Sequence, residues 1–130
     1  MNGKKPAPAL WMDEPEEHDY PAAEDYLSLI FVPKTAEELA RKLKKARILR
    51  RKAKDLLRAS GLIVLGKDNY FVQHNLDKIA SGKALSPVLL VRGDAMRHIP
   101  LIVADGYHRI CASWHHDENA VIPCRIVNCP

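Results

Sequence analysis

The residues of this chain whose types and spacing best suit chemistry are five in a row: Asp105, Gly106, Tyr107, His108 and Arg109. An apolar run rich in branched residues precedes them at 101–104 and predicts a buried strand. The residues after Gly106 can continue as a helix with a basic pair in its first turn. Backbone N–H groups of a first helical turn have no acceptor within the helix and attract anions. Strand, glycine turn and helix start therefore predict a phosphate site, although an ordinary strand-to-helix junction with a surface arginine has the same pattern.

Each of the five residues has a role in that interpretation. The planar guanidinium of Arg109 can hold two phosphate oxygens. His108 is a donor to phosphate or a general acid–base group, with a buried structural histidine as the alternative. Asp105 is expected to cap the helix, with a catalytic role or the placing of a divalent metal as alternatives. Gly106 and Tyr107 complete the predicted phosphate- or nucleotide-binding loop, in which the glycine leaves no Cβ to block a ligand.

The motif and its surroundings resemble the ParB/sulfiredoxin superfamily. Residues 105–109, followed by Cys111 and Ala112, are similar to that family's Gly-x-x-Arg helix start. Residues 75–82 resemble its short helix with a closing glycine, residues 86–91 its Pro-hydrophobic strand, and residues 121–127 its closing strand. The resemblance covers about residues 61–128. It implies a nucleotide- or phosphate-binding site at the 105–109 loop, with Arg109 on the phosphate.

The resemblance does not fix the reaction, because members bind and hydrolyse CTP, cleave nucleic acid, reduce sulfinic acids or phosphorylate free serine. Tyr107 stands where sulfiredoxins carry their catalytic cysteine, and a phenol does not replace a thiolate nucleophile. The Asp-Gly-x-His-Arg pattern is closer to free-serine kinases, although their catalytic glutamate is not recognisable. We therefore expect ATP or CTP with Mg²⁺ as cofactor, and a phosphotransferase, an NTPase or a nuclease as the enzyme class.

Composition places the protein among soluble globular chains, and we expect it in the cytoplasm. Its 130 residues are 47% hydrophobic and 28% charged, without an apolar run of the roughly 20 residues that a membrane span needs. The three cysteines lack Cys-x-x-Cys spacing and suit reduced thiols. His115 and His116 are adjacent and would point about 100° apart on a helix, so we expect no metal site there.

Charge is distributed unevenly along the chain. Residues 1–34 hold three basic and seven acidic residues, residues 35–60 hold ten and three, and residues 61–130 hold seven and six. A basic helical face at 41–58 predicts contact with the phosphate backbone of DNA or RNA. The alternative is a solvated face partnered by the acidic N-terminal arm. The cations that we expect to contact nucleic acid are Lys44, Lys45, Arg47, Arg50, Arg51 and Lys54.

The expected helices and strands are placed by the periodicity of apolar residues, by helix-capping residues and by glycines that end helices. We expect an α+β fold: a small mixed β-sheet with packed helices, ParB/sulfiredoxin-like, preceded by a helical N-terminal segment. Residues 1–19 read as a flexible acidic tail in which Trp11 docks onto its own domain, residues 20–60 as a helical segment, and residues 61–130 as the core. The expected helices are 21–30, 35–60 (one helix or two with a bend near 47–51), 74–80 and 106–116. The expected strands are 62–65, 87–91, 100–104 and 121–127, and residues 70–72 either extend the first strand or pack under the next helix.

Overall fold

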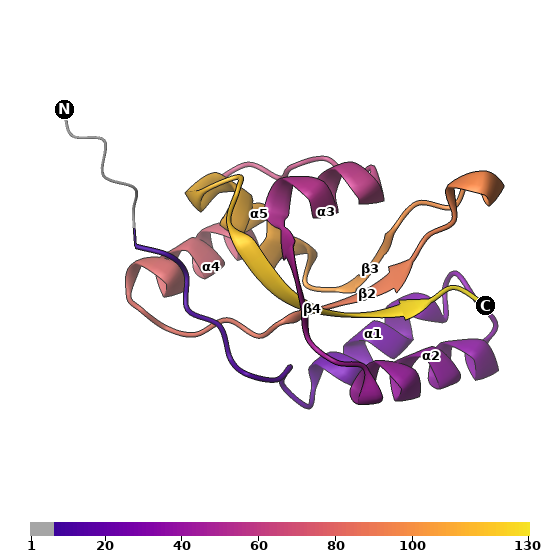
Figure 1. Cartoon of the computed structure of the whole chain (residues 1–130). Helices are drawn as coiled ribbons and strands as arrows, with labels where there is room; N and C mark the ends of the chain where they lie inside the picture. The colour runs from indigo at the N-terminus through magenta and orange to yellow at the C-terminus, as the bar shows by residue number, and fades with distance from the viewer. Residues whose placement is uncertain (1–6) are drawn as a thin grey trace.

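The structure, a computed structural model, describes residues 7–130 and has an α+β fold with a small mixed sheet. The sheet has four strands in the order β1-β4-β2-β3, with β2 and β4 parallel and the other pairs antiparallel (Figure 1). The strands are β1 (Leu49–Lys52), β2 (Val88–Arg92), β3 (Ile102–Asp105) and β4 (Val121–Asn128). The helices are α1 (Asp19–Leu27), α2 (Pro33–Lys45), α3 (Ala53–Ser60), α4 (Tyr70–Ala80) and α5 (Tyr107–His116), with a 3-10 turn at Ala95–Arg97.

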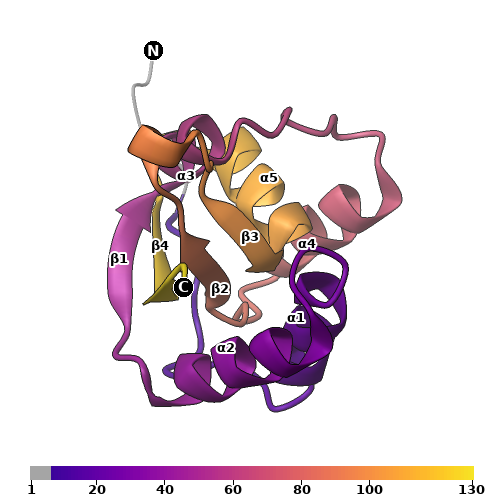
Figure 2. The ribbon, with the colours of Figure 1, turned by 90° about the vertical axis from the view of Figure 1, so that its right-hand side faces the viewer.

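Helices cover both faces of the sheet, as Figure 2 shows with α1 and α2 below it and α3 and α5 above, while α4 packs against α5. Strand β2 is central and apolar on both sides. Its Val88 and Leu90 pack toward α3 and α5, and its Leu89 and Val91 toward α1 and α2. The strand and helix expected at 100–104 and 106–116 are confirmed to within two residues, so the 105–109 motif does lie at a strand-to-helix junction.

The basic segment differs from the helix expected at 35–60. Helix α2 ends at Lys45, edge strand β1 pairs antiparallel with β4, and α3 follows it. Pairing of β1 with β4 is a tertiary interaction that overrides the local helical periodicity. The capping box expected at Thr35 is also wrong, because α2 begins at Pro33, which suits the first helical turn, and Val32 gives no side-chain cap.

The strand expected at 62–65 is absent, since these residues belong to no ladder among residues 7–130. Val64 and Leu65 pack on the core as a loop, and the Leu65 carbonyl oxygen lies 2.7 Å from His115 Nε2. Residues 70–72 form the first turn of α4, where Val72 is fully buried. Asn69 caps this turn, because its Oδ1 accepts from the backbone N–H groups of residues 71 and 72.

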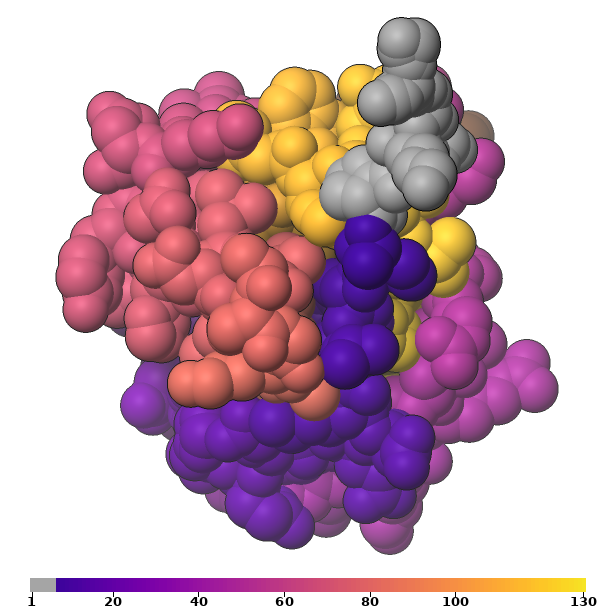
Figure 3. All heavy atoms as spheres, turned by 90° about the vertical axis from the view of Figure 1, so that its left-hand side faces the viewer, coloured from indigo at the N-terminus to yellow at the C-terminus, as the bar shows by residue number. Residues whose placement is uncertain are grey.

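The N-terminal segment is not a flexible tail where the structure describes it. Residues 7–18, which we call the arm, lie along the surface beside α4 and the segment that links it to β2, and run down to the α1–α2 layer (Figure 3). Trp11 forms a parallel bridge with Leu85 and packs on the core, which confirms that it docks onto its own domain. Asp19 is buried and begins α1. Residues 1–6, also placed in the expected tail, lie outside the described part of the chain. No helix within residues 7–130 is long and apolar enough to cross a bilayer.

Candidate functional site

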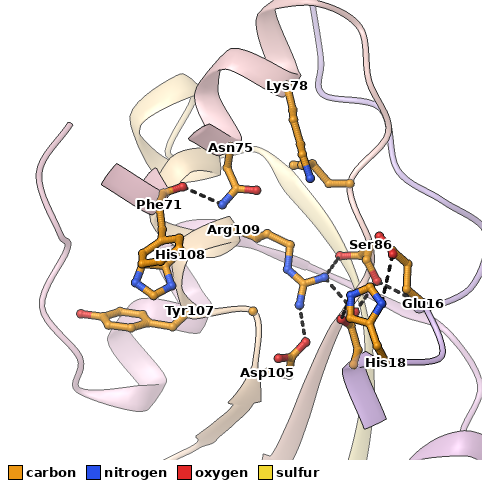
Figure 4. Close-up of a pocket in the computed structure, with 13 residues that line it drawn as sticks. Glu16, His18, Phe71, Asn75, Lys78, Ser86, Asp105, Tyr107, His108 and Arg109 are labelled. Carbon is orange, nitrogen blue, oxygen red and sulfur yellow. Dashed lines mark hydrogen bonds and ion pairs between the residues drawn. The ribbon is translucent and has the colours of Figure 1, made fainter. Parts of the chain in front are cut away.

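A cavity of about 240 Å³ lies at the N-terminus of α5. Its walls come from α4, from the first turn of α5, from Ser86 before β2, and from the arm (Figure 4). Asp105, Gly106, Tyr107, His108 and Arg109 all line it. The structure therefore brings the whole 105–109 motif to one cavity.

Gly106 shapes the junction between β3 and α5. Its φ is +112°, in the region that favours glycine, and a Cβ there would lie 2.4 Å from Val88 Cγ1. It is the N-cap residue of α5, and no side chain caps this helix. The N–H groups of the first turn consequently have no acceptor within the helix and no side-chain cap, and the residues that bear them line the cavity.

Asp105 is not the helix cap that the sequence indicated. Its Oδ2 accepts from Nη2 of Arg109 at 2.5 Å, across the first turn of α5. Gly106, which follows Asp105, is the N-cap residue of α5, and the Asp105 carboxylate pairs with the guanidinium instead. Burial raises the pKa of Asp105 to about 6, a rise that Arg109 opposes and the Asp19 charge adds to.

Arg109 is held by the protein on both outer nitrogens. Nη1 donates to Asp19 Oδ2 at 3.1 Å and to the Ser86 carbonyl at 2.7 Å, while Nη2 donates to Asp105. The Ser86 hydroxyl donates to the same Asp19 oxygen at 2.5 Å, and the arginine side chain is only 13% exposed. Arg109 thus lies in the cavity wall. The bidentate phosphate contact expected of it would require a carboxylate to leave.

His108 and Tyr107 lie beside the cavity with different surroundings. The His108 ring centroid lies 5.1 Å from that of Phe71 and 5.7 Å from that of Tyr107. Burial lowers the pKa of His108, so its ring is neutral near pH 7. The Tyr107 hydroxyl donates to the Ile63 carbonyl at 2.5 Å. The phenol is therefore engaged by the 61–65 loop. The group of Tyr107 that can donate to a phosphate is its backbone N–H, in the uncapped first turn of α5.

Three residues of α4 and three of the N-terminal region line the cavity and were missed by the sequence interpretation. Lys78 is partly buried, makes no ion pair within residues 7–130, and points into the cavity in Figure 4. Asn75 lies beside it, and its side-chain amide donates to the Phe71 carbonyl at 2.9 Å. The spacing 71, 75, 78 places these residues on one face of a helix and could have indicated them. Glu16, His18 and Asp19 complete the wall through tertiary contacts that carry no local signal.

The cations assigned to nucleic-acid binding do not share one helix face. Lys44 and Lys45 end α2, Arg47 lies in the turn after it, Arg50 and Arg51 lie in β1, and Lys54 lies in α3. Neighbouring residues of a strand point to opposite faces, so Arg50 and Arg51 diverge. Lys44 lies 3.9 Å from Glu17 of the arm, the one ion pair among these six in the described chain.

A metal centre is not indicated by the side chains of residues 7–130, where no three His, Cys, Asp or Glu residues gather to hold an ion. His115 Nε2 contacts the Leu65 carbonyl oxygen, and His116 Nε2 contacts that of Ala7 at 2.7 Å, so the adjacent histidines have separate partners.

No family model, curated protein or solved structure matches the chain. A functional assignment therefore depends on the chemistry of the cavity itself.

Proposed function

We propose that this protein binds the phosphate group of a small ligand, such as ATP or CTP, in the cavity at the N-terminus of α5. One observation carries the proposal: the uncapped first turn of α5 and the ammonium of Lys78, which has no ion pair in the described chain, border the same space. Both favour an anion, the helix through its N–H groups and dipole and the lysine through its charge. The sequence resemblance to the ParB/sulfiredoxin superfamily supports the same location.

The acidic residues of the cavity do not oppose this assignment. Asp19 and Asp105 share the guanidinium of Arg109 and are tied to it by hydrogen bonds. Glu16 Oε2 lies 3.4 Å from Nδ1 of His18. The carboxylates thus have partners in the wall formed by the arm, the start of α1 and β3. The donors that remain, the ammonium of Lys78 and the N–H groups of the first turn of α5, lie in the opposite wall, formed by α4 and α5. In this proposal Arg109 positions the wall, and the direct phosphate contacts belong to the amides of α5 and to Lys78.

Phosphoryl transfer is the reaction class that we attach to this site. A general base works best when its pKa lies near the working pH, and the pKa of Asp105 is about 6. His108, neutral near pH 7, is the second proposed acid–base group. Mg²⁺ with a nucleotide is usually held by phosphate oxygens, waters and one or two carboxylates, and Glu16, whose side chain is partly exposed, is the carboxylate that would hold it here.

Titration calorimetry with ATP and CTP, with and without Mg²⁺, tests the proposal. Lys78→Ala should weaken binding by about 1.5–3 kcal/mol, as expected for a lost hydrogen bond to a charged partner. Lys34→Ala is the matched control, because Lys34 is exposed and lies at the start of α2, away from the cavity. No binding of either nucleotide by the wild type at millimolar concentration would refute the proposal.

Nucleic-acid binding is a second candidate, favoured by the edge strand β1. Arg50, Arg51 and Lys52 are exposed there and make no ion pair among residues 7–130. Edge strands also carry cations to prevent edge-to-edge aggregation, which is the simpler explanation. Fluorescence anisotropy with duplex DNA separates the two. If the strand binds DNA, affinity falls with rising salt, and reversing Arg50 and Arg51 to Glu abolishes it while Arg92→Glu does not.

A further inference from the structure

Five rings form a continuous aromatic cluster that adjoins the cavity through Phe71, Tyr107 and His108. We call it the aromatic rim: Tyr70, Phe71 and His74 of α4, and Tyr107 and His108 of α5. Phe71 is the link between the two helices. Its centroid lies 5.3 Å from that of Tyr70 and 5.1 Å from that of His108. Phe71 also lines the cavity, so the rim and the cavity adjoin (Figure 4).

The rim is ordered and yet exposed. Asn69 caps the turn of α4 that bears Tyr70 and Phe71, and His74 lies parallel to the Tyr70 ring, with 7° between the planes. Despite these supports, Tyr70 is 74% and Phe71 56% exposed. Two neighbouring aromatic side chains thus present ring surface to solvent beside a polar cavity.

The size of the cavity decides which part of a nucleotide could enter it. Pockets that enclose whole drug-sized ligands usually measure about 300–1,000 Å³. At about 240 Å³ this cavity is smaller, so it suits a phosphate chain and leaves a base outside. With the phosphates inside, the base would lie outside the cavity, next to the part of the wall that Phe71 forms.

We propose that the aromatic rim is a nucleobase-stacking platform, on which the base packs against Phe71 while the phosphates occupy the cavity. This inference rests on the proposed phosphate site and names its ligand class as nucleotides. Every base has a π-face, so stacking alone tolerates different bases. The burial-lowered pKa of His108 keeps that ring uncharged near pH 7 and suited to stacking beside Phe71. The larger ring system of adenine gives ATP a modest advantage over CTP.

Calorimetry with ATP and with inorganic tripolyphosphate separates the platform from the phosphate site. The variants are Phe71→Leu, which keeps an apolar side chain without a ring, and Phe71→Trp, which keeps a ring. Tyr26→Leu is the control, because Tyr26 is an exposed aromatic residue on α1 that does not line the cavity. Phe71 and Tyr26 are both exposed, so all three substitutions are compatible with folding.

We expect the wild type to bind ATP about tenfold more tightly than tripolyphosphate. Phe71→Leu should remove that advantage and leave tripolyphosphate binding within about twofold, whereas Phe71→Trp and Tyr26→Leu should keep it. Equal affinities for the two ligands in the wild type, or equal weakening of both by Phe71→Leu, would overturn the platform and leave the phosphate site standing. Failure of both ligands to bind would overturn the phosphate site and the platform together.

Discussion

Arg109 joins three parts of the chain that are far apart in sequence. It extends from α5 to Asp19 at the start of α1, to the Ser86 carbonyl before β2 and to Asp105 at the end of β3. Because its side chain and that of Asp19 are 13% and 7% exposed, this charge pair is largely shielded from water. An arginine serves here better than a lysine, since its planar fork meets several acceptors at once.

Replacing Arg109 by Met should destabilise the protein strongly. The substitution keeps much of the side-chain volume but leaves Asp19 and Asp105 without their shared cation, a loss that typically costs about 3–5 kcal/mol. The free energy of unfolding in urea measures the effect. Arg92→Met is the control, because exposed Arg92 makes one side-chain hydrogen bond, to Asn128 at 3.1 Å, and should cost less than about 1 kcal/mol. Equal costs for the two substitutions would contradict the role given to Arg109.

Asp105 gives the stability a pH dependence whose sign follows from its pKa. Burial raises that pKa from 3.8 to about 6, so the folded state holds the proton more tightly than the unfolded state. The stability gained from this group is complete below about pH 4 and is lost as the pH rises through about 6.

Asp105→Asn has no carboxyl to ionise and keeps an oxygen that can accept from Arg109. Between pH 4.5 and 7 the free energy of unfolding of the wild type should therefore fall relative to that of the variant, by at most about 3 kcal/mol. Urea titrations at the two pH values measure the difference. A difference that stays constant with pH would show that the carboxyl is not perturbed as described.

At the scale of elements, the junction of β3, Gly106 and α5 sets the geometry of the cavity. Two requirements meet at Gly106, a positive φ and close contact with Val88. Gly82 shares the positive φ, at +73°, but has open space around it. Gly82 therefore gives the cost of a positive φ without a clash, whereas at Gly106 the clash adds to a φ of +112° that lies further from the left-handed minimum.

Gly82→Ala should lower the free energy of unfolding by about 1–2 kcal/mol, the usual cost of a left-handed conformation for a residue with a Cβ. Gly106→Ala should cost at least about 1 kcal/mol more, because Val88 Cγ1 lies in a packed core and has to move. Chemical denaturation of both variants measures this. If the two substitutions cost the same, Val88 does not constrain the junction.

The sequence predicted those elements whose signals are local. The apolar strand before Gly106, the Pro-hydrophobic strand now seen as β2, and the helix beginning at Tyr107 all have such signals, and each lies within two residues of its expected position. The edge strand β1 was missed because Arg50, Arg51 and Lys52 have no apolar alternation, and only pairing with β4 makes them a strand. The 62–65 run was mistaken for a strand because it is apolar and partly β-branched, but it forms a loop in which Val64 and Leu65 pack on the core while Leu62 and Ile63 are exposed.

The candidate site was likewise predictable only where its signals are local in the sequence. Residues 105–109 are contiguous, so their common location followed from sequence. The cap assigned to Asp105 did not, because Gly106 is the N-cap residue of α5. The free fork assigned to Arg109 did not either, because its pairing depends on Asp19, 90 residues away in the chain. Lys78 and Phe71 reach the cavity through the packing of α4 against α5. Their helical spacing indicates a shared face, but nothing local in the sequence places that face beside residues 105–109.

At the scale of the whole molecule, the arm completes the cavity and links the two helical layers. Met12 N donates to the Leu85 carbonyl at 2.8 Å, and Glu16 N donates to the Ser86 hydroxyl at 3.0 Å. Its acidic side chains contact Lys44 and Arg125 at 3.9 and 3.8 Å, so the arm does pair with basic residues of the body. The cavity is thus assembled from segments near both ends and the middle of the chain.

The most direct test of this account is a nuclear magnetic resonance titration of the ¹⁵N-labelled protein with Mg²⁺–ATP, with sodium chloride added to a reference sample at matched ionic strength. The account predicts saturable shifts of the backbone amide signals of Tyr107, His108 and Arg109, because their N–H groups would donate to the phosphate. Amide signals of Arg50 and Arg51 in β1 should move little. Unchanged signals at the start of α5 in millimolar Mg²⁺–ATP, or shifts confined to β1, would contradict the central claim.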